Sequence, residues 1–178
     1  SLLSARAVAR DADINNRTAQ KRLDALRRAF VAFPVHREQG LAPKPRSQSK
    51  WYFTDPALTR LAAGRRAGSA PDRTALAEQQ LALALLRRLE AVTPGAAIHH
   101  DRLLYYRSSS GAEVDFVARD FASTCVESKY VDDRWGHAFK TVAASGRSPG
   151  FVVTRSGLQA HGDGWAVPAG VFVYLMGS

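Results

Sequence analysis

The chain has 178 residues, of which 46% are hydrophobic and 23% charged, a composition that supports a folded core and excludes disorder throughout. Its formal net charge of +9 favours acidic partners such as nucleic acid or an anionic membrane surface. The single cysteine, Cys125, excludes an intrachain disulfide and a cysteine-rich zinc site, and no apolar stretch reaches the roughly 18 residues of a membrane helix, so we expect a cytoplasmic protein without membrane contact.

The positive charge is concentrated at the N-terminal end. Residues 1–50 hold 11 Lys or Arg against 4 Asp or Glu, a balance of +7, whereas residues 51–178 hold 14 against 12, a balance of +2. The chain begins with Ser1 and enters a helical pattern at once, so we expect a fragment of a longer protein. The basic N-terminal part is the natural place to look for an anionic partner.

The first predicted elements are two helices separated by a polar break. Apolar residues recur at helical spacing over 2–10, Asn15 and Asn16 can cap a helix, and a basic helix is predicted over 17–30. Two β-rich runs, 30–36 and 51–55, then flank a basic loop, and a short helix leads into a Gly/Ser/Pro linker that ends near residue 71. This order predicts a winged-helix domain over residues 1–68.

The remaining residues alternate between helix and strand patterns. Asp72 can cap a helix that runs to about Val92. Strands are predicted over 103–107, 112–118, 123–131, 150–155 and 171–175, with a helix over 134–144 between the third and fourth strands. We therefore expect an α/β (α+β) fold, whose second domain, residues 72–178, has a mixed central sheet flanked by helices.

Two of these strands carry charged residues in otherwise apolar runs. Glu127 and Lys129 in "VESKYV" are two apart, so their side chains leave one face of the strand, and Asp115 interrupts "EVDFV" on the preceding strand. A short turn over 119–122 would make the strands antiparallel neighbours, so that Asp115 and Glu127 meet. Two such carboxylates repel unless a divalent cation lies between them, and Mg²⁺ or Mn²⁺ suits oxygen ligands.

This arrangement supplies the parts of a phosphodiester hydrolase. The cation would offset charge on the scissile phosphate, and Lys129 would orient the attacking water or stabilise the developing charge. The alternative is an ordinary salt bridge between Lys129 and Asp115 or Glu127 on an exposed sheet face. Glu113 shares the Asp115 face but lies near the strand start, where we expect a solvated edge residue.

Glu78 lies on the apolar stripe of the helix after Asp72, at offsets of three, four, seven and eleven from Leu81, Ala82, Leu85 and Leu89. A carboxylate on a core-facing stripe needs a partner, and a cation-bound water or Lys129 would provide one. The alternative is that an acid near a helix start is favoured by the helix dipole alone.

The helix with Glu78, followed by "LLYYRSSSGAEVDFVARD" and "CVESKYV", resembles the PD-(D/E)XK nuclease superfamily, also called restriction-endonuclease-like, whose core order is αβββαβ. The resemblance implies that Asp115 and Glu127 bind the metal, that Lys129 is catalytic and that Glu78 is a supporting acid. The sequence departs from the superfamily signature in that no Pro precedes Asp115.

The segments "KWYFTDPALTRL", "YYRSSSGAEVDF" and "ESK" resemble the C-terminal region of a family of prokaryotic AAA-type ATP-binding proteins, in which a winged helix precedes the nuclease-like domain. The likeness spans nearly the whole chain and implies an ATPase domain elsewhere in the parent protein. No G-x-x-x-x-G-K-[ST] loop occurs in these 178 residues, so any ATP binding would reside outside them.

The basic N-terminal part gives a second class of function, a nucleic-acid-binding module. Side chains of the basic helix would follow a groove of the nucleic acid, and the loop after it would touch phosphates. The candidate contacts are Asn16, Arg17, Gln20, Lys21, Arg22, Arg27, Arg28, Lys44, Arg46 and Lys50. The alternative is a solvated helix face in a domain that packs against the ATPase or another subunit.

Together these features predict a metal-dependent nuclease-like module that acts on nucleic acid, with DNA expected first. The rival prediction is a nuclease-fold domain without activity that binds DNA or a partner protein for the ATPase.

Overall fold

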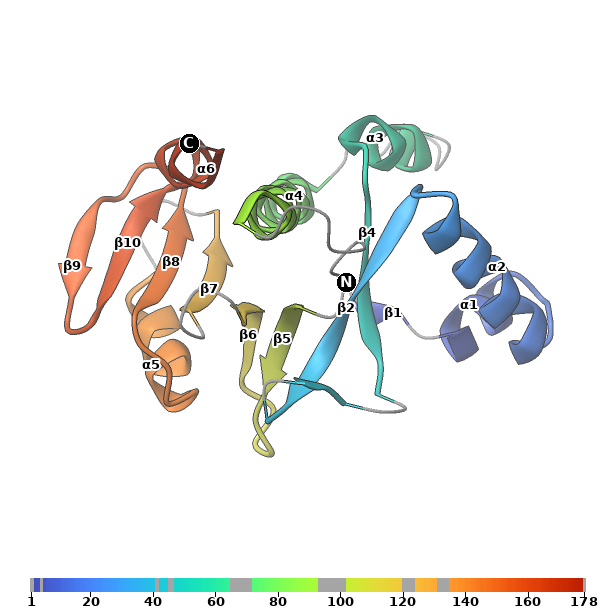
Figure 1. Cartoon of the computed structure of the whole chain (residues 1–178), viewed down its shortest axis with the longest axis horizontal. Helices are drawn as coiled ribbons and strands as arrows, with labels where there is room; N and C mark the ends of the chain where they lie inside the picture. Colours follow the sequence, from blue (N-terminus) through green and yellow to red (C-terminus); the bar gives the residue numbers. More distant parts are fainter. Residues whose placement is uncertain are drawn as a thin grey trace.

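The computed structural model describes residues 2–3, 5–40, 42–44, 47–64, 72–92, 102–119, 124–130 and 135–177. Within these ranges the chain forms a mixed α/β structure with one continuous sheet (Figure 1). The strands are β1 (Leu2–Leu3), β2 (Ala32–Gln39), β3 (Ala42–Pro43), β4 (Ser49–Phe53), β5 (Leu103–Arg107), β6 (Glu113–Ala118), β7 (Thr124–Lys129), β8 (Gly150–Thr154), β9 (Gln159–His161) and β10 (Gly164–Pro168). The helices are α1 (Ala5–Asp11), α2 (Asn16–Arg28), α3 (Pro56–Gly64), α4 (Arg73–Val92), α5 (Gly136–Ala144) and α6 (Ala169–Gly177).

The sheet runs through both of the predicted domains. Its strands follow the order β1-β4-β2-β5-β6-β7-β8-β10-β9, and β3 pairs with β2 outside this path. β2 is parallel to β5 through His36↔Leu104 and Arg37↔Tyr105, which joins the N-terminal strands to the C-terminal ones. The linker predicted between the domains falls at 65–71, outside the described residues. The mixed sheet expected for the second domain is therefore extended by N-terminal strands.

The N-terminal elements follow the predicted order of helix, helix and two strands. Asn15 is the N-cap of α2, because its side chain accepts a hydrogen bond from the Thr18 backbone N–H at 2.8 Å. β2 and β4 pair antiparallel. One difference lies at the start, where Leu2 and Leu3 form β1 and pair with Lys50 and Ser49 of β4 rather than beginning a helix.

The elements α4, β5, β6, β7, α5 and β8 appear in the predicted order. Asp72 begins α4, since its carboxylate accepts a hydrogen bond from the Thr74 backbone N–H at 2.9 Å. β6 and β7 are antiparallel neighbours as predicted, with Phe116 paired to Val126 and Val117 to Cys125. β8 then returns parallel to β7. Helices therefore cover both faces, α4 and α6 on one and α5 on the other (Figure 1).

The strand predicted over 171–175 is wrong, because these residues lie in helix α6. The residues that α6 turns to the core are Ala169, Phe172 and Met176, which recur three and four apart as in a helix. Val171 and Tyr174 face outward, with 46% and 75% of their surface exposed. The last strand along the chain is instead β10, which pairs parallel with β8.

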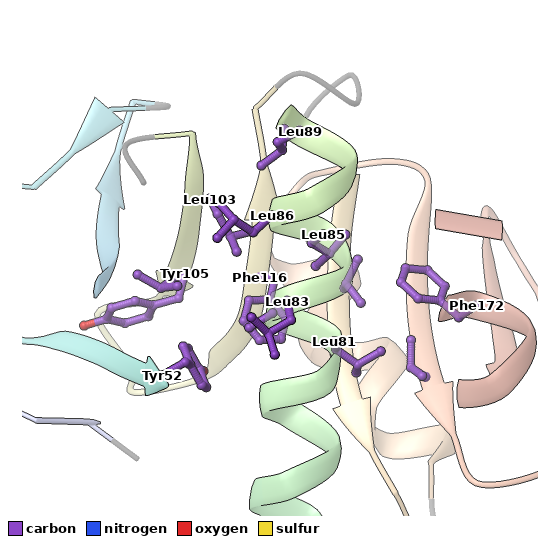
Figure 2. Close-up of a cluster of buried hydrophobic side chains, with 14 of the residues drawn as sticks. Tyr52, Leu81, Leu83, Leu85, Leu86, Leu89, Leu103, Tyr105, Phe116 and Phe172 are labelled. Atoms are coloured by element: carbon purple, nitrogen blue, oxygen red, sulfur yellow. The ribbon is translucent and has the colours of Figure 1, made fainter. Parts of the chain in front are cut away.

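The main core lies between α4 and the sheet (Figure 2). Leu81, Leu85 and Leu89 are at most 1% exposed and pack with Phe116 and Tyr105. Each fully buried leucine contributes about 1.5 to 3 kcal/mol relative to an exposed one. This packing fixes α4 against β6 and β7 and thereby the position of Glu78. None of the helices in the described ranges has the length and apolar character needed to cross a bilayer.

Replacing Gly164 of β10 by alanine is expected to lower the free energy of unfolding by about 2 to 3 kcal/mol. An added Cβ would lie 2.6 Å from the Gly150 backbone oxygen of β8 and 2.9 Å from Phe139 Cε1, so the parallel strand pair would have to separate. Urea unfolding followed by circular dichroism measures the change. The control is Gly170→Ala in α6, where an added Cβ meets nothing within 4 Å and about 0.5 to 1 kcal/mol of stabilisation is expected; equal effects of the two changes would contradict the close approach.

Candidate active site

A bulge in β6 directs Asp115 toward the α4 side of the sheet. Leu104 of β5 pairs with Val117 and Tyr106 pairs with Val114, so the consecutive residues Asp115 and Phe116 both lie opposite one residue of β5. Phe116 joins the core beneath α4, and the Asp115 carboxylate reaches the same side. Bulges commonly redirect a side chain beside a functional site.

Asp115 and Glu127 interlock across β6 and β7. The Asp115 backbone N–H donates to Glu127 Oε2 at 3.1 Å, and the Ser128 backbone N–H donates to Asp115 Oδ2 at 2.8 Å. Each carboxylate thus takes a hydrogen bond from the opposite strand just beyond the pair Phe116↔Val126. The two acids are therefore neighbours across the strand pair, and their side chains are 14% and 6% exposed.

Lys129 completes the group predicted from the sequence. Its Nζ lies 2.7 Å from Glu127 Oε1, and the side chain is 41% exposed. Burial lowers the pKa of Lys129, but the hydrogen bond and the charge of Glu127 outweigh it and raise the pKa above its ordinary value. Lys129 is therefore an ammonium at neutral pH, suited to donate hydrogen bonds and positive charge rather than to accept a proton.

Lys50 enters the same region from β4. Its Nζ lies 2.6 Å from Asp115 Oδ1, 2.9 Å from Glu113 Oε1 and 3.3 Å from Glu78 Oε1, and its side chain is 3% exposed. Burial alone would lower the pKa of this ammonium, yet the carboxylates of Asp115, Glu78 and Glu113 raise it well above its usual range. Lys50 is thus a permanent buried cation.

Tyr52, two residues after Lys50 on β4, fixes the Glu78 carboxylate. Its hydroxyl donates to Glu78 Oε1 at 2.5 Å. Burial and the Glu78 charge raise the pKa of Tyr52 well above its ordinary value, so the phenol stays a donor. In the structure Glu78 contacts Tyr52 and Lys50, whereas the sequence led us to expect a cation-bound water or Lys129; the ion pair of Lys129 is with Glu127. We call the four carboxylates of this region the acidic cluster: Glu78, Glu113, Asp115 and Glu127.

Glu127 is the member of this cluster whose pKa is most clearly changed. Burial, and then the neighbouring Asp115 carboxylate, raise its pKa from 4.5 to about 7, although Lys129 and the Asp115 backbone N–H act in the opposite direction. The group titrates near neutral pH, where a carboxyl can exchange a proton. A cation beside it would favour the ionised form.

The raised Glu127 pKa predicts how stability depends on pH. The folded protein holds the Glu127 proton more tightly than the unfolded chain, so this stabilisation is complete below pH 4.5 and is lost as pH rises through 7. The loss is on the order of 3 kcal/mol. In urea unfolding between pH 4.5 and 8, Glu127→Gln is expected to remove this part of the slope. Glu90→Gln, an exposed change at the end of α4, is expected to retain it; identical slopes for all three proteins would contradict the assignment.

The residues present have the chemistry for a divalent cation at one position of the site. Asp115 and Glu127 offer carboxylate oxygens, which each keep a free lone pair after accepting one hydrogen bond. In the described part of the chain, however, no group of three or more Asp, Glu, His or Cys side chains forms a ready-made ion cage. The centre of Glu78, Glu113 and Asp115 holds the Lys50 ammonium instead. The fit is therefore at Asp115 and Glu127, beside Lys129.

Three members of the site were missed or misplaced from the sequence. Glu113 was expected to be a solvated edge residue, but it pairs with Lys50 and is 26% exposed. Lys50 was expected in the basic loop as a phosphate contact, whereas β4 begins at Ser49 and places Lys50 in the interior. Tyr52 was not considered. The available signal was the two-residue spacing of Lys50 and Tyr52, which puts both on one face of a strand.

A basic groove of about 690 Å³ lies between the α1–α2 pair and the strands β2 and β4. Some of the other predicted nucleic-acid contacts line this groove, and the rest do not. Its lining includes Arg6, Asn16, Gln20, Arg27, Lys44 and Trp51. Four of these were predicted, and Arg6 and Trp51 were not. The predicted contacts on α2 that do not line the groove are Arg17, Lys21, Arg22 and Arg28, all exposed. Arg46 lies outside the described residues.

Comparisons of the chain with models of known protein families, with curated protein sequences and with solved structures found no significant match. We therefore infer function from the geometry of the site and the groove.

Proposed function

We propose that the acidic cluster and Lys129 form a metal-dependent phosphodiesterase site of the PD-(D/E)XK type, carried by a restriction-endonuclease-like unit over α4 to β8. The observation that carries the proposal is the pair Asp115 and Glu127, linked by hydrogen bonds across β6 and β7. The Lys129 Nζ lies beside this pair, 2.7 Å from Glu127 Oε1. The order α4-β5-β6-β7-α5-β8, with β8 parallel to β7, supports it. The proposed cofactor is Mg²⁺, or Mn²⁺ in its place.

Each residue has a defined part in this site. Asp115 and Glu127 hold the cation, which when bound supplies positive charge against the charge of the scissile phosphate. Lys129, half open to solvent, donates hydrogen bonds to the attacking water or to a phosphate oxygen. Glu78 is a positioning residue, because it holds Lys50 beside Asp115 and is itself held by Tyr52.

A cleavage assay tests the proposal. The chain is incubated with double-stranded DNA, single-stranded DNA or single-stranded RNA in Mg²⁺ or Mn²⁺, and parallel samples contain EDTA. Cleavage of at least one substrate, lost in EDTA, is expected. If none of the three substrates is cleaved in either metal, the proposed phosphodiesterase activity is ruled out.

A second candidate is a nuclease-fold module without activity that binds DNA or a protein. The observation in its favour is Lys50, whose ammonium already neutralises part of the acidic cluster without any metal. In that case neither ion binding nor cleavage would be detected, while the basic groove would still bind its partner.

For the N-terminal elements we propose a winged-helix nucleic-acid-binding unit, with α2 as the recognition helix and the chain from β2 to β4 as the wing. The basic groove supports this because Arg6, Arg27 and Lys44 bring positive charge to its walls from α1, α2 and the residue after β3, against one acidic lining residue, Asp24. Asn16 and Gln20 add side-chain amides suited to base edges. We propose DNA as the first partner to test. We also propose a cytoplasmic location, because the protein would reach the cell's nucleic acid there without crossing a membrane.

The proposal for the groove predicts different effects for two arginines of α2. Arg27→Gln, inside the groove, is expected to weaken DNA binding by about 10-fold and to reduce the slope of log affinity against log salt by about one, since a phosphate contact is lost. Fluorescence anisotropy with labelled duplex DNA at several salt concentrations measures both. Arg22→Gln removes the same charge from the same helix outside the groove and is the matched control; equal losses for the two variants would place the interface on the whole helix rather than in the groove.

The same proposal includes a parent protein. The sequence resemblance to C-terminal regions of AAA-type ATP-binding proteins leads us to propose an ATPase domain in the same longer chain, acting on the nucleic acid that this region binds or cuts. Detection of a phosphate-binding loop upstream in the parent sequence would support this affiliation, and an unrelated upstream sequence would remove it.

A further inference from the structure

The Lys50 ammonium is enclosed like a bound cation. A lysine ammonium has three N–H donors and no acceptor, and three carboxylate oxygens, from Asp115, Glu113 and Glu78, lie within 2.6 to 3.3 Å of Nζ. The Tyr105 ring lies below it, with the centroid 5.6 Å from Nζ. With 3% of the side chain exposed, the ammonium is held by groups of the protein itself.

The charges around it leave room for a single divalent ion. The four carboxylates of the acidic cluster, when ionised, face the two ammonium groups of Lys50 and Lys129, which leaves two negative charges. Arg107 approaches Glu113 only at 4.0 Å and is 41% exposed, so solvent screens its contribution. One divalent cation balances the remainder.

A second divalent ion would need the oxygens that Lys50 already occupies. Paired metal ions in phosphodiesterases lie about 3.5 to 4 Å apart and share carboxylates. Beside Asp115, the carboxylates within reach of such a second position are those of Glu78 and Glu113, and the Lys50 ammonium stands among them. Two positive charges at that separation repel strongly in a buried site.

We propose that Lys50 is a built-in cation that takes the place of a second metal ion, so that the site accepts one divalent ion at Asp115 and Glu127, beside Lys129. This inference rests on the proposed function. It also makes the N-terminal part of the chain a structural component of the site, because β4 supplies Lys50 and reaches the acidic cluster through β2 and its parallel partner β5. The N-terminal unit would thus set the number of metal ions as well as bind nucleic acid.

The test counts Mn²⁺ ions by isothermal titration calorimetry, with Mn²⁺ alone as the probe. The wild type is expected to bind one ion, and Lys50→Met is expected to bind two. Lys50→Gln, which keeps amide donors but removes the charge, is a second variant for the case in which the methionine variant does not fold, and it is also expected to bind two. Lys140→Met changes an exposed lysine of α5 and is the matched control, expected to bind one. Electron paramagnetic resonance of the loaded Lys50 variants is expected to show coupling between neighbouring Mn²⁺ ions.

The outcomes separate this inference from the function on which it rests. If the wild type binds two ions, or if both Lys50 variants bind one, the inference is overturned, while the proposed metal site at Asp115 and Glu127 is retained. No Mn²⁺ bound by any protein would overturn the proposed function and the inference with it. Failure of both Lys50 variants to fold even with Mn²⁺ present would also overturn the inference, because the vacated position would then not accept a cation.

Discussion

Lys129→Ala is expected to reduce metal-dependent cleavage by at least about 100-fold while leaving the fold intact. Removal of one group that stabilises developing charge commonly costs about 100- to 1,000-fold in rate, and Lys129 is kept charged by Glu127. Because its side chain is 41% exposed and contacts the edge of the site, little packing is lost. The rate is measured on whichever nucleic acid the wild type cuts, at saturating Mg²⁺.

The control for this prediction is Lys140→Ala, an equivalent truncation on the exposed surface of α5, with thermal unfolding recorded for all three proteins. Lys129→Arg keeps the positive charge and should recover part of the rate. A Lys129→Ala protein with wild-type cleavage would show that the lysine is only an ion-pair partner of Glu127.

Lys50→Met is expected to cause the largest loss of stability of any single change considered, about 3 to 5 kcal/mol in the free energy of unfolding. Removing one partner of a buried ion pair leaves charge without compensation, which costs about that amount. Here Asp115 and Glu113 lose a contact at 2.6 and 2.9 Å, and Glu78 loses one at 3.3 Å. Methionine matches the lysine stem closely, so the loss reports the charge rather than a cavity.

Urea unfolding at pH 7 in EDTA measures this effect, and Lys140→Met, expected to stay within about 0.5 kcal/mol of the wild type, is the control. A loss below about 1 kcal/mol at pH 7 would mean that the acidic cluster is neutralised by some other group.

The part of the site that sequence reasoning predicted is the part built from local structure. Asp115 and Glu127 are neighbours because β6 and β7 follow one another in the chain and pair antiparallel, an arrangement that spacing and alternation predict; the turn predicted over 119–122 lies, apart from Arg119, outside the described residues. The helix caps at Asn15 and Asp72 were likewise local. The order of α4 to β8 followed from apolar periodicity.

The part that sequence reasoning missed depends on contacts between distant segments. Lys50 reaches Asp115 because β2 pairs with β5 across a long intervening chain, and no local pattern specifies that pairing. The bulge opposite Tyr105 has no glycine to mark it. A strand was predicted over 171–175 because "VFVYL" is rich in β-branched and aromatic residues. These residues lie in α6, where Phe172 and Met176 pack against the core at helical spacing.

The measurement that addresses the metal site most directly is anomalous X-ray scattering from crystals soaked in Mn²⁺. We predict a peak between the side chains of Asp115 and Glu127, with carboxylate oxygens of both within about 2.0 to 2.5 Å of the ion, and no peak at the Lys50 position. A well-ordered crystal that takes up Mn²⁺ elsewhere, or not at all, while these two carboxylates stay bound only to backbone N–H groups and lysines, would contradict the account.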